Sequence, residues 1–462
     1  MYDMVMKWQD RDKINGQPIG KTLVSLAVPA VLSTFFTLIF EFIDMFWIAK
    51  LGADAAAGLS AASFFVWMLR GLALIVATGA IALVSRRAGE KDEQGLLKTI
   101  LNSIGSSFVF SILMMALFFP FAVKVFQWLR LDPQVAALSE DYTVVFLAGL
   151  VFVYLMMTLE FIIRGIGNTR IPMILTGISL LLNAVLDPLF IFKLGMGLKG
   201  AAYATILSQG VGALLMTAAL LKKIPDLKKL SSNGTAHPVK TFTALKRFAG
   251  QFYTIVKIGG PVGVSDAGFS FIYLLLSGII SIFGKEPLAA IGIAHRLEAL
   301  PFFICLGFSM AVAPMVGQYL GAGKPGHARE SVYLSLKITV GILLIISLLF
   351  FIFAHSLFRF FIDDPAIIRH GVSYLRILSI FEIFLAFEVV LGGAFSGAGD
   401  TRPPFLIVLP ITVSRVPLAY LFTVIFPLGV SAIWLIIALT MVLKGTLLLI
   451  AFNKGKWAKK KI

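Results

Sequence analysis

Long runs of apolar residues, separated by short polar segments, dominate this chain of 462 residues. A transmembrane helix needs about 20 consecutive, mostly apolar residues, and most of these runs are that long or longer. Backbone polar groups cannot stay unpaired in hydrocarbon, so each run is expected to be a helix. The predicted helices lie at residues 22–48, 56–85, 98–125, 137–163, 171–193, 198–222, 254–284, 286–316, 330–356, 370–395, 403–426 and 428–451. The pattern therefore predicts an all-α polytopic membrane protein with 12 transmembrane helices.

The charges orient these helices. Hydrophobic residues make up 58% of the chain and charged residues 14%, with a net charge of +16. Lys and Arg gather near both termini and between the second and third and the sixth and seventh spans, whereas the opposite loops, such as LGADAAAG and FPLGVSA, are nearly free of them. This is the positive-inside pattern, and it predicts a multi-pass protein of the cell (plasma) membrane with both termini cytoplasmic and no cleavable signal. Topology and anionic lipid explain the net charge without a nucleic-acid partner.

The two halves of the chain are related by a constant offset of 232 residues. Pro261 corresponds to Pro29 and Tyr374 to Tyr142, and RGIGNTRIP at 164–172 shares the pattern G-x-G-x-T-R-x-P with SGAGDTRPP at 396–404. Each half holds six predicted spans, so both halves start on the same side and are related by an axis along the membrane normal. We therefore predict two pseudo-symmetric six-helix lobes, 1–222 and 253–462, joined by a cytoplasmic linker at 223–252.

Acidic residues inside the apolar runs are candidate functional residues, because a carboxylate deep in the bilayer costs about 2.5–3.5 kcal/mol on insertion scales. Glu41 and Asp44 share one face of the first span, and Asn183 and Asp187 share one face of the fifth. The two aspartates lie at similar depths and could meet. Two close carboxylates in a low-dielectric pocket do not both ionise comfortably, so one would carry a proton or both would bind a cation. Asn183 and Thr205 could add neutral oxygens for Na⁺. The simpler alternative is that each aspartate reaches the membrane interface.

Several of these motifs resemble those of the multidrug and toxic compound extrusion family. They are RGxGNTRxP, SGxGDTRxP, Pro29, Asp44, the N-x-x-x-D pair in the fifth span and GMGLKGAAYAT. The similarity covers nearly the whole chain, and the first-half set is similar to the prokaryotic DinF-like branch. The resemblance implies a V-shaped pair of six-helix bundles that exports amphipathic, often cationic, organic compounds in exchange for H⁺ or Na⁺. It assigns ion or proton binding to the positions matching Asp44, Asn183, Asp187 and Thr205.

Pro29 is a candidate hinge. It removes a backbone hydrogen bond about a dozen residues before Glu41, so the first helix could bend there when the carboxylate charge changes. The alternative is a static kink, because proline is common in membrane helices and Pro261 repeats it in the second half.

The second half lacks the acidic pairs of the first, so ion coupling is expected in the first lobe alone. The second half has intramembrane charges of its own, at Asp266, Glu382, Glu388 and Arg415. Arg415 could pair with either glutamate as a structural counterion, or these residues could touch the substrate. Tyr142 is a further candidate for the substrate cavity, with an interfacial anchor as the alternative.

Catalytic and cofactor motifs are absent from the sequence: the five histidines show no metal-ligand spacing, and no G-x-x-x-x-G-K-[ST] loop is present. We therefore expect no enzyme activity, no cofactor, and transport by a monomer that draws on an ion gradient. The interpretation is a secondary active antiporter that works by alternating access on a small, amphipathic organic cation. The alternative is a lipid or lipid-linked oligosaccharide flippase of related architecture, which would need cationic rather than acidic groups in its cavity.

Overall fold

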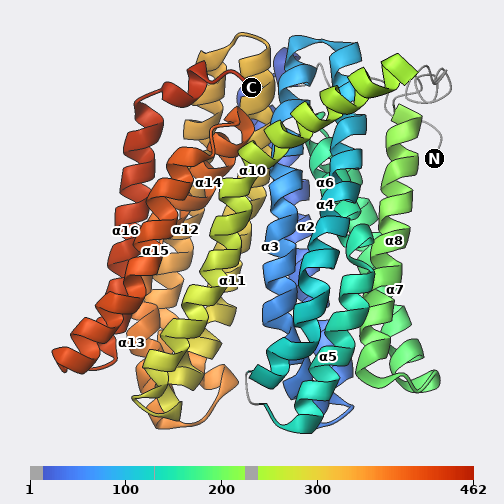
Figure 1. The fold of residues 1–462 in the computed structure, drawn as a ribbon. Helices are drawn as coiled ribbons and strands as arrows, with labels where there is room; N and C mark the ends of the chain where they lie inside the picture. The colour runs from blue at the N-terminus through green and yellow to red at the C-terminus, as the bar shows by residue number, and fades with distance from the viewer. Residues whose placement is uncertain (1–13, 129–130, 224–237) are drawn as a thin grey trace.

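A computed structural model of the chain describes residues 14–128, 131–223 and 238–462. Every regular element among these residues is helical, and the helices form one bundle (Figure 1). In the described part, ten helices are long and apolar enough to cross a membrane alone, and two bent helix pairs raise the number to twelve if each pair is one span. The predicted fold class is confirmed, with the qualification that two of the predicted spans are not straight.

The first half contains α2 to α8. Its elements are α2 (Ile19–Ala49), α3 (Ala53–Glu90), α4 (Glu93–Trp128), α5 (Pro133–Ala148), α6 (Leu150–Gly165), α7 (Arg170–Pro188), the π-helical η1 (Leu189–Lys193) and α8 (Gly197–Lys223). The second half contains α10 to η3. Its elements are α10 (Pro238–Ser281), α11 (Lys285–Gly321), α12 (Pro325–Phe361), α13 (Pro365–Phe381), α14 (Ile383–Ala398), α15 (Arg402–Tyr420), the π-helical η2 (Leu421–Ile425), α16 (Ser431–Asn453) and the short η3 (Lys456–Lys459).

The repeat of the sequence is also a repeat of the structure. The elements α7 and η1 correspond to α15 and η2 residue for residue at the offset of 232. Helices α5 and α13 begin with the same cap, in which Asp132 or Asp364 accepts a backbone hydrogen bond ahead of a proline in the first turn. Each is then followed by a bend, of 56° before α6 and 59° before α14. The same local chemistry therefore builds the same shape twice.

Helix α10 begins well before the seventh predicted span. The described chain resumes at Pro238, and the helix continues without a break to Ser281. Its first turns run obliquely across one end of the bundle (Figure 1). Part of the predicted linker therefore belongs to α10, and residues 224–237 lie outside the described residues. The boundaries of the lobes and the linker stay a prediction.

We call the end of the bundle where α8 ends and α10 begins the linker end, and the opposite end, where α5 and α13 begin, the far end. The two halves lie close together at the linker end and diverge toward the far end (Figure 1). This is the V shape that the family resemblance implied.

Backbone-to-backbone packing joins the halves where α3 crosses α11. A Cβ atom added to Gly317 would lie 1.9 Å from Ser85 Oγ, and one added to Gly89 would lie 2.1 Å from the carbonyl oxygen of Gln318. Ser85 and Gly317 are equivalent positions at the offset of 232, so the crossing lies on the pseudo-twofold axis. Only residues without a side chain allow the backbones to come this close.

Side chains at equivalent positions strengthen the same crossing. Gln318 Nε2 donates a hydrogen bond to the carbonyl oxygen of Gly165 at 2.8 Å, and its counterpart Arg86 donates through Nη2 to the carbonyl oxygen of Ala398 at 3.4 Å. Arg86 also donates to the carbonyl oxygen of Lys460, just after η3, at 3.1 Å. The linker end is therefore closed by contacts that repeat around the pseudo-twofold axis.

Candidate functional site

Three helices of the first half bring a polar cluster into an otherwise apolar interior. Asp187 and Asn183 come from α7, Thr205 from α8 and Tyr142 from α5, and each of these side chains is at most 5% exposed. Asn183 Nδ2 donates a hydrogen bond to Asp187 Oδ1 at 2.7 Å, and Thr205 Oγ1 donates to Asn183 Oδ1 at 3.4 Å. Tyr142 lies beside Thr205. The structure thus brings together four of the residues that the sequence nominated.

Asp44 joins this cluster from α2. Its carboxylate is half-buried and interacts electrostatically with Asp187 and Tyr142. The expectation that the first and fifth spans bring their aspartates close together therefore agrees with the geometry. Glu41 lies in α2, but its side chain is outside the described part of the structure.

Local structure explains why Asp187 faces this cluster. Asn183 and Asp187 are one helical turn apart, so their side chains meet on one face of α7. Pro188 follows at once and has no N–H to donate, and the chain continues as the π-helix η1. The second half has the same π-helical turn after α15, so the turn belongs to the repeated fold and not to the acidic cluster alone.

One atom of the cluster lacks a hydrogen-bond partner. Asp187 Oδ2 is buried and has no partner among the described residues. An ionised carboxylate oxygen in such a place is costly unless a proton or a cation accompanies it. The carboxylates of Asp44 and Asp187, with the amide oxygen of Asn183 and the hydroxyl of Thr205, form an oxygen-rich set that suits a proton or a hard cation such as Na⁺.

Pro29 is buried inside α2, and the helix continues on both sides of it. It lies two residues before Val31, whose backbone approaches Gly307 of α11 so closely that a Cβ there would lie 2.7 Å from the Val31 nitrogen. Thr34 Oγ1 also reaches the carbonyl oxygen of Phe303 at 3.2 Å. The candidate hinge is therefore next to the contact between the two halves, while Asp44 lies further along the same helix.

The charges of the second half pair differently from the expectation. Glu388 forms an ion pair with Lys444 of α16 at 2.6 Å, not with Arg415. Arg415 instead donates to Tyr273 Oη at 3.0 Å and Thr440 Oγ1 at 2.8 Å. The proposed pairing with Glu388 was wrong because helix packing, not spacing along the chain, selects the partner. Lys444 was recognisable in the sequence as a candidate partner, because it is a lysine within an apolar run.

Two further carboxylates of the second half lie near each other. Glu298 of α11 accepts a hydrogen bond from Tyr374 Oη at 3.0 Å, and Glu382, 3% exposed, lies at the bend between α13 and α14 and interacts with it electrostatically. Glu298 was missed by the sequence reasoning although it stands within the eighth apolar run. Asp266 is apart from these residues, on an exposed part of α10 beside Gly71 of α3.

These features define a class of protein. The bundle is a membrane protein built from two six-span repeats that close at one end and diverge at the other, with a buried acidic cluster in one repeat, which is the layout of a transporter. The chain belongs to the MatE family: the family model matches it twice, at residues 29–189 and 261–421, with the same offset that relates the two halves. The protein is therefore a transporter of the plasma membrane and not an enzyme.

Similar proteins cover almost the whole chain. The chain is 29% identical to a probable multidrug resistance protein NorM of Thermotoga maritima over 96% of its length and 94% of the relative. It is 25% identical to the probable multidrug resistance protein YpnP of Bacillus subtilis, with 96% of each covered. It is also 23% identical to the multidrug export protein MepA of Staphylococcus aureus, with 90% of each covered.

Solved structures agree in fold. An outward-facing multidrug resistance MATE family transporter superposes with a TM-score of 0.86 at 22% identity, covering 99% of this chain and 100% of that one. A transporter of the MOP superfamily from Pyrococcus furiosus superposes with a TM-score of 0.85 at 23% identity, again covering 99% of this chain and 100% of that one. The three relatives named above carry the names of multidrug proteins, so the flippase alternative is not favoured.

Proposed function

We propose that the protein is a secondary active antiporter that exports small, amphipathic organic compounds, cationic ones in particular, in exchange for H⁺ or Na⁺. The observation that carries this proposal is the buried Asp187, whose Oδ2 atom has no hydrogen-bond partner and whose carboxylate interacts with that of Asp44. Relatives named as multidrug exporters support the substrate class.

The coupling step follows from charge. A proton or Na⁺ bound between Asp44 and Asp187 neutralises part of their mutual repulsion and lets α2 and α7 pack closely. When the ion leaves, the two carboxylates repel, and α2 moves relative to α7. Asn183 and Thr205 then change their hydrogen bonds, because they share the oxygen atoms that the ion contacted.

Helix α2 can transmit this change to the other lobe. It holds Asp44 near the far end, and Val31 and Thr34 at the contact with α11. A bend at Pro29 would move one end relative to the other, since the proline leaves its helix short of one backbone hydrogen bond. We propose that this is how ion exchange alters the contact between the lobes. The site also includes Glu41, close in sequence to Asp44.

The remaining features of the function are proposals of the same kind. The substrate cavity lies between the lobes, with Tyr142, Asp266, Glu382, Glu388 and Arg415 as candidate contacts. The lobes are 1–222 and 253–462, the protein acts as a monomer, and both termini are cytoplasmic. In that orientation the cavity between the diverging lobes opens to the outside.

Transport in proteoliposomes tests the coupling site. We expect gradient-driven movement of a fluorescent organic cation by the parent protein, under an imposed pH or Na⁺ gradient. Asp44→Asn and Asp187→Asn should each abolish the response to the gradient, because an amide cannot exchange a proton or offer a second anionic oxygen. The matched control is Asp141→Asn, which removes an exposed carboxylate that pairs with Lys199 at 2.9 Å.

Each outcome has a separate meaning. If both site variants keep gradient-driven transport, the coupling assignment is wrong. If no organic cation moves through the parent protein but an anionic glycolipid does, the substrate class is wrong and the flippase alternative holds. Replacement of Na⁺ by K⁺ at constant pH distinguishes the two ions, because a proton-coupled carrier keeps its activity.

A further inference from the structure

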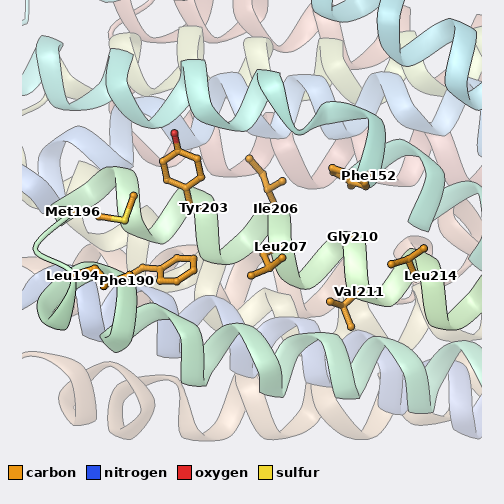
Figure 2. A pocket seen from close by; sticks show the side chains of 10 residues that line it. All are labelled: Phe152, Phe190, Leu194, Met196, Tyr203, Ile206, Leu207, Gly210, Val211 and Leu214. Atoms are coloured by element: carbon orange, nitrogen blue, oxygen red, sulfur yellow. The ribbon is translucent and has the colours of Figure 1, made fainter.

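A groove with a purely apolar lining runs along the outer face of α8. It is bounded by α8, by Phe152 of α6 and by η1 with the turn that follows it, and its volume is about 450 Å³ (Figure 2). Along α8 its lining residues include Tyr203, Leu207, Gly210 and Leu214, which recur at helical spacing on one face. Leu207 is 47% and Leu214 is 69% exposed, so the groove is open to the surroundings of the bundle, which are lipid.

The length of the groove corresponds to one leaflet of the bilayer. Tyr203 and Leu214 are eleven residues apart, or about 16 Å at ~1.5 Å per residue. The hydrocarbon core of a bilayer is about 30 Å thick, so the groove reaches from one membrane interface to about the middle. The residues from η1 and its turn lie at one end of the groove and Leu214 lies at the other (Figure 2).

The groove is deep enough to hold a chain because of Gly210. A Cβ at this position would be in ordinary contact with Phe152, at 3.4 Å, so the missing side chain leaves space between α8 and α6. The equivalent position in the second half is Val442, whose side chain would occupy the same place on α16. The feature is therefore specific to the first lobe.

Two lysines lie at the far-end mouth of the groove, and one of them, Lys199, forms an ion pair with Asp141 of α5 at 2.9 Å. Lys199 precedes Tyr203 by one helical turn and lies close enough to interact with it electrostatically. Lys193 is exposed and directly precedes Leu194, which lines the groove. Lys193 has no acidic partner among the described residues. A lysine of this kind at an interface, above an apolar groove one leaflet deep, matches a phosphate group with a hydrocarbon chain below it.

We propose that this groove binds one acyl chain of an anionic phospholipid from the far-end leaflet, with its phosphate beside Lys193. The bound chain lies directly behind the acidic cluster. Phe190 of the groove is three residues after Asp187, and Ile206, another lining residue, follows Thr205 and packs on Gly149 at the bend before α6. The lipid therefore supports the outer wall of that cluster. The binding itself does not depend on the proposed function.

Photolabelling of the purified full-length protein tests the site. The protein is reconstituted in phosphatidylcholine vesicles containing a trace of phosphatidylglycerol with a diazirine in the middle of one acyl chain, and labelled peptides are mapped. We expect labelling concentrated in the peptide of residues 197–223 and in the segment of α6 around Phe152. Gly210→Leu, which fills the groove, should reduce this labelling at least fivefold, and Gly210→Ala should reduce it less.

Val442→Phe is the matched control, because it adds the same number of carbon atoms as Gly210→Leu at the equivalent position of the other lobe and should leave the labelling unchanged. Thermal melting curves establish that the variants are folded. Labelling spread evenly over the lipid-facing helices, or unchanged in Gly210→Leu, would overturn the proposal. Equal labelling by a phosphatidylcholine probe would overturn the choice of an anionic lipid.

Discussion

The crossing of α3 and α11 predicts that one added methyl group will loosen the closed linker end. In Gly317→Ala, the new Cβ would lie 1.9 Å from Ser85 Oγ, 2.7 Å from Ser85 Cβ and 3.1 Å from the carbonyl oxygen of Gly397. Rotating the hydroxyl group of Ser85 relieves only the first of these contacts. The other two involve Cβ and backbone atoms, so the helices themselves must move apart.

The expected size of the effect follows from these contacts. Overpacking by one methyl group in a well-packed region costs about 1–3 kcal/mol. The cost applies to the arrangement in which the lobes are closed at the linker end, and it is absent when they separate there. Since ~1.4 kcal/mol corresponds to a factor of ten, the ratio of open to closed molecules at this end should rise about 5- to 150-fold.

Pulsed electron paramagnetic resonance can measure this shift. Spin labels at Gln94→Cys and Gly326→Cys, two equivalent and exposed positions at the linker end, report the separation of the lobes. The single native cysteine, Cys305, is buried and can be replaced by alanine. We expect Gly317→Ala to add or enlarge a population at longer distance.

Two further variants make the experiment decisive. Gly341→Ala, in α12, adds the same methyl group where nothing lies within 4 Å, and it should leave the distances unchanged. Ser85→Gly in the Gly317→Ala background removes the two closest contacts and should restore most of the parent distribution. If Gly317→Ala gives the parent distribution, or if Ser85→Gly does not reverse its effect, the crossing is not what holds the linker end closed.

Other predictions concern stability and the chain end. Lys444→Met should destabilise the protein by about 3–5 kcal/mol, because it leaves the carboxylate of Glu388 without its partner, and adding Glu388→Gln should recover part of the loss in a thermal melt. Tyr154→Phe removes the hydrogen bond that Tyr154 donates to the carbonyl oxygen of Leu69 at 2.8 Å, and it should lower the free energy of unfolding by about 1 kcal/mol. An unchanged melting temperature would contradict the importance of that bond. Deleting residues 460–462 removes the carbonyl oxygen of Lys460, which accepts a hydrogen bond from Arg86, and the ion pair of Lys460 with Asp400 at 3.1 Å. The spin labels at the linker end should then show a broader distance distribution.

The acidic cluster illustrates what spacing along a helix can predict. Asn183 and Asp187 share a face because they are four residues apart, and the hydrogen bond between them follows from that spacing. The meeting of Asp44 with Asp187 was anticipated by counting residues from the helix ends, since depth in the membrane constrains which positions can face each other. The inclusion of Tyr142 beside Thr205 was not predicted, because it depends on how α5 packs against α8.

The second half shows where such reasoning stops. Arg415 was expected to pair with a glutamate of the tenth span, yet Glu388 pairs with Lys444 and Arg415 binds Tyr273 and Thr440. Tyr273, on α10, is 142 residues from Arg415, and Lys444, on α16, is 56 residues from Glu388. Their choice depends on the rotation of each helix about its own axis, which the sequence of a span that is apolar on all sides does not reveal.

The sequence by itself determined the apolar runs and their approximate positions, the repeat of 232 residues and the faces on which Asp44 and Asp187 lie, because hydrophobic length and helical periodicity are properties of the chain alone. Only the tertiary structure decided the partners across helices, the crossing at Gly317 and the groove beside Gly210. A glycine matters at these two positions because Ser85 and Phe152 lie close to them, and helix packing, not the local sequence, brings those residues there.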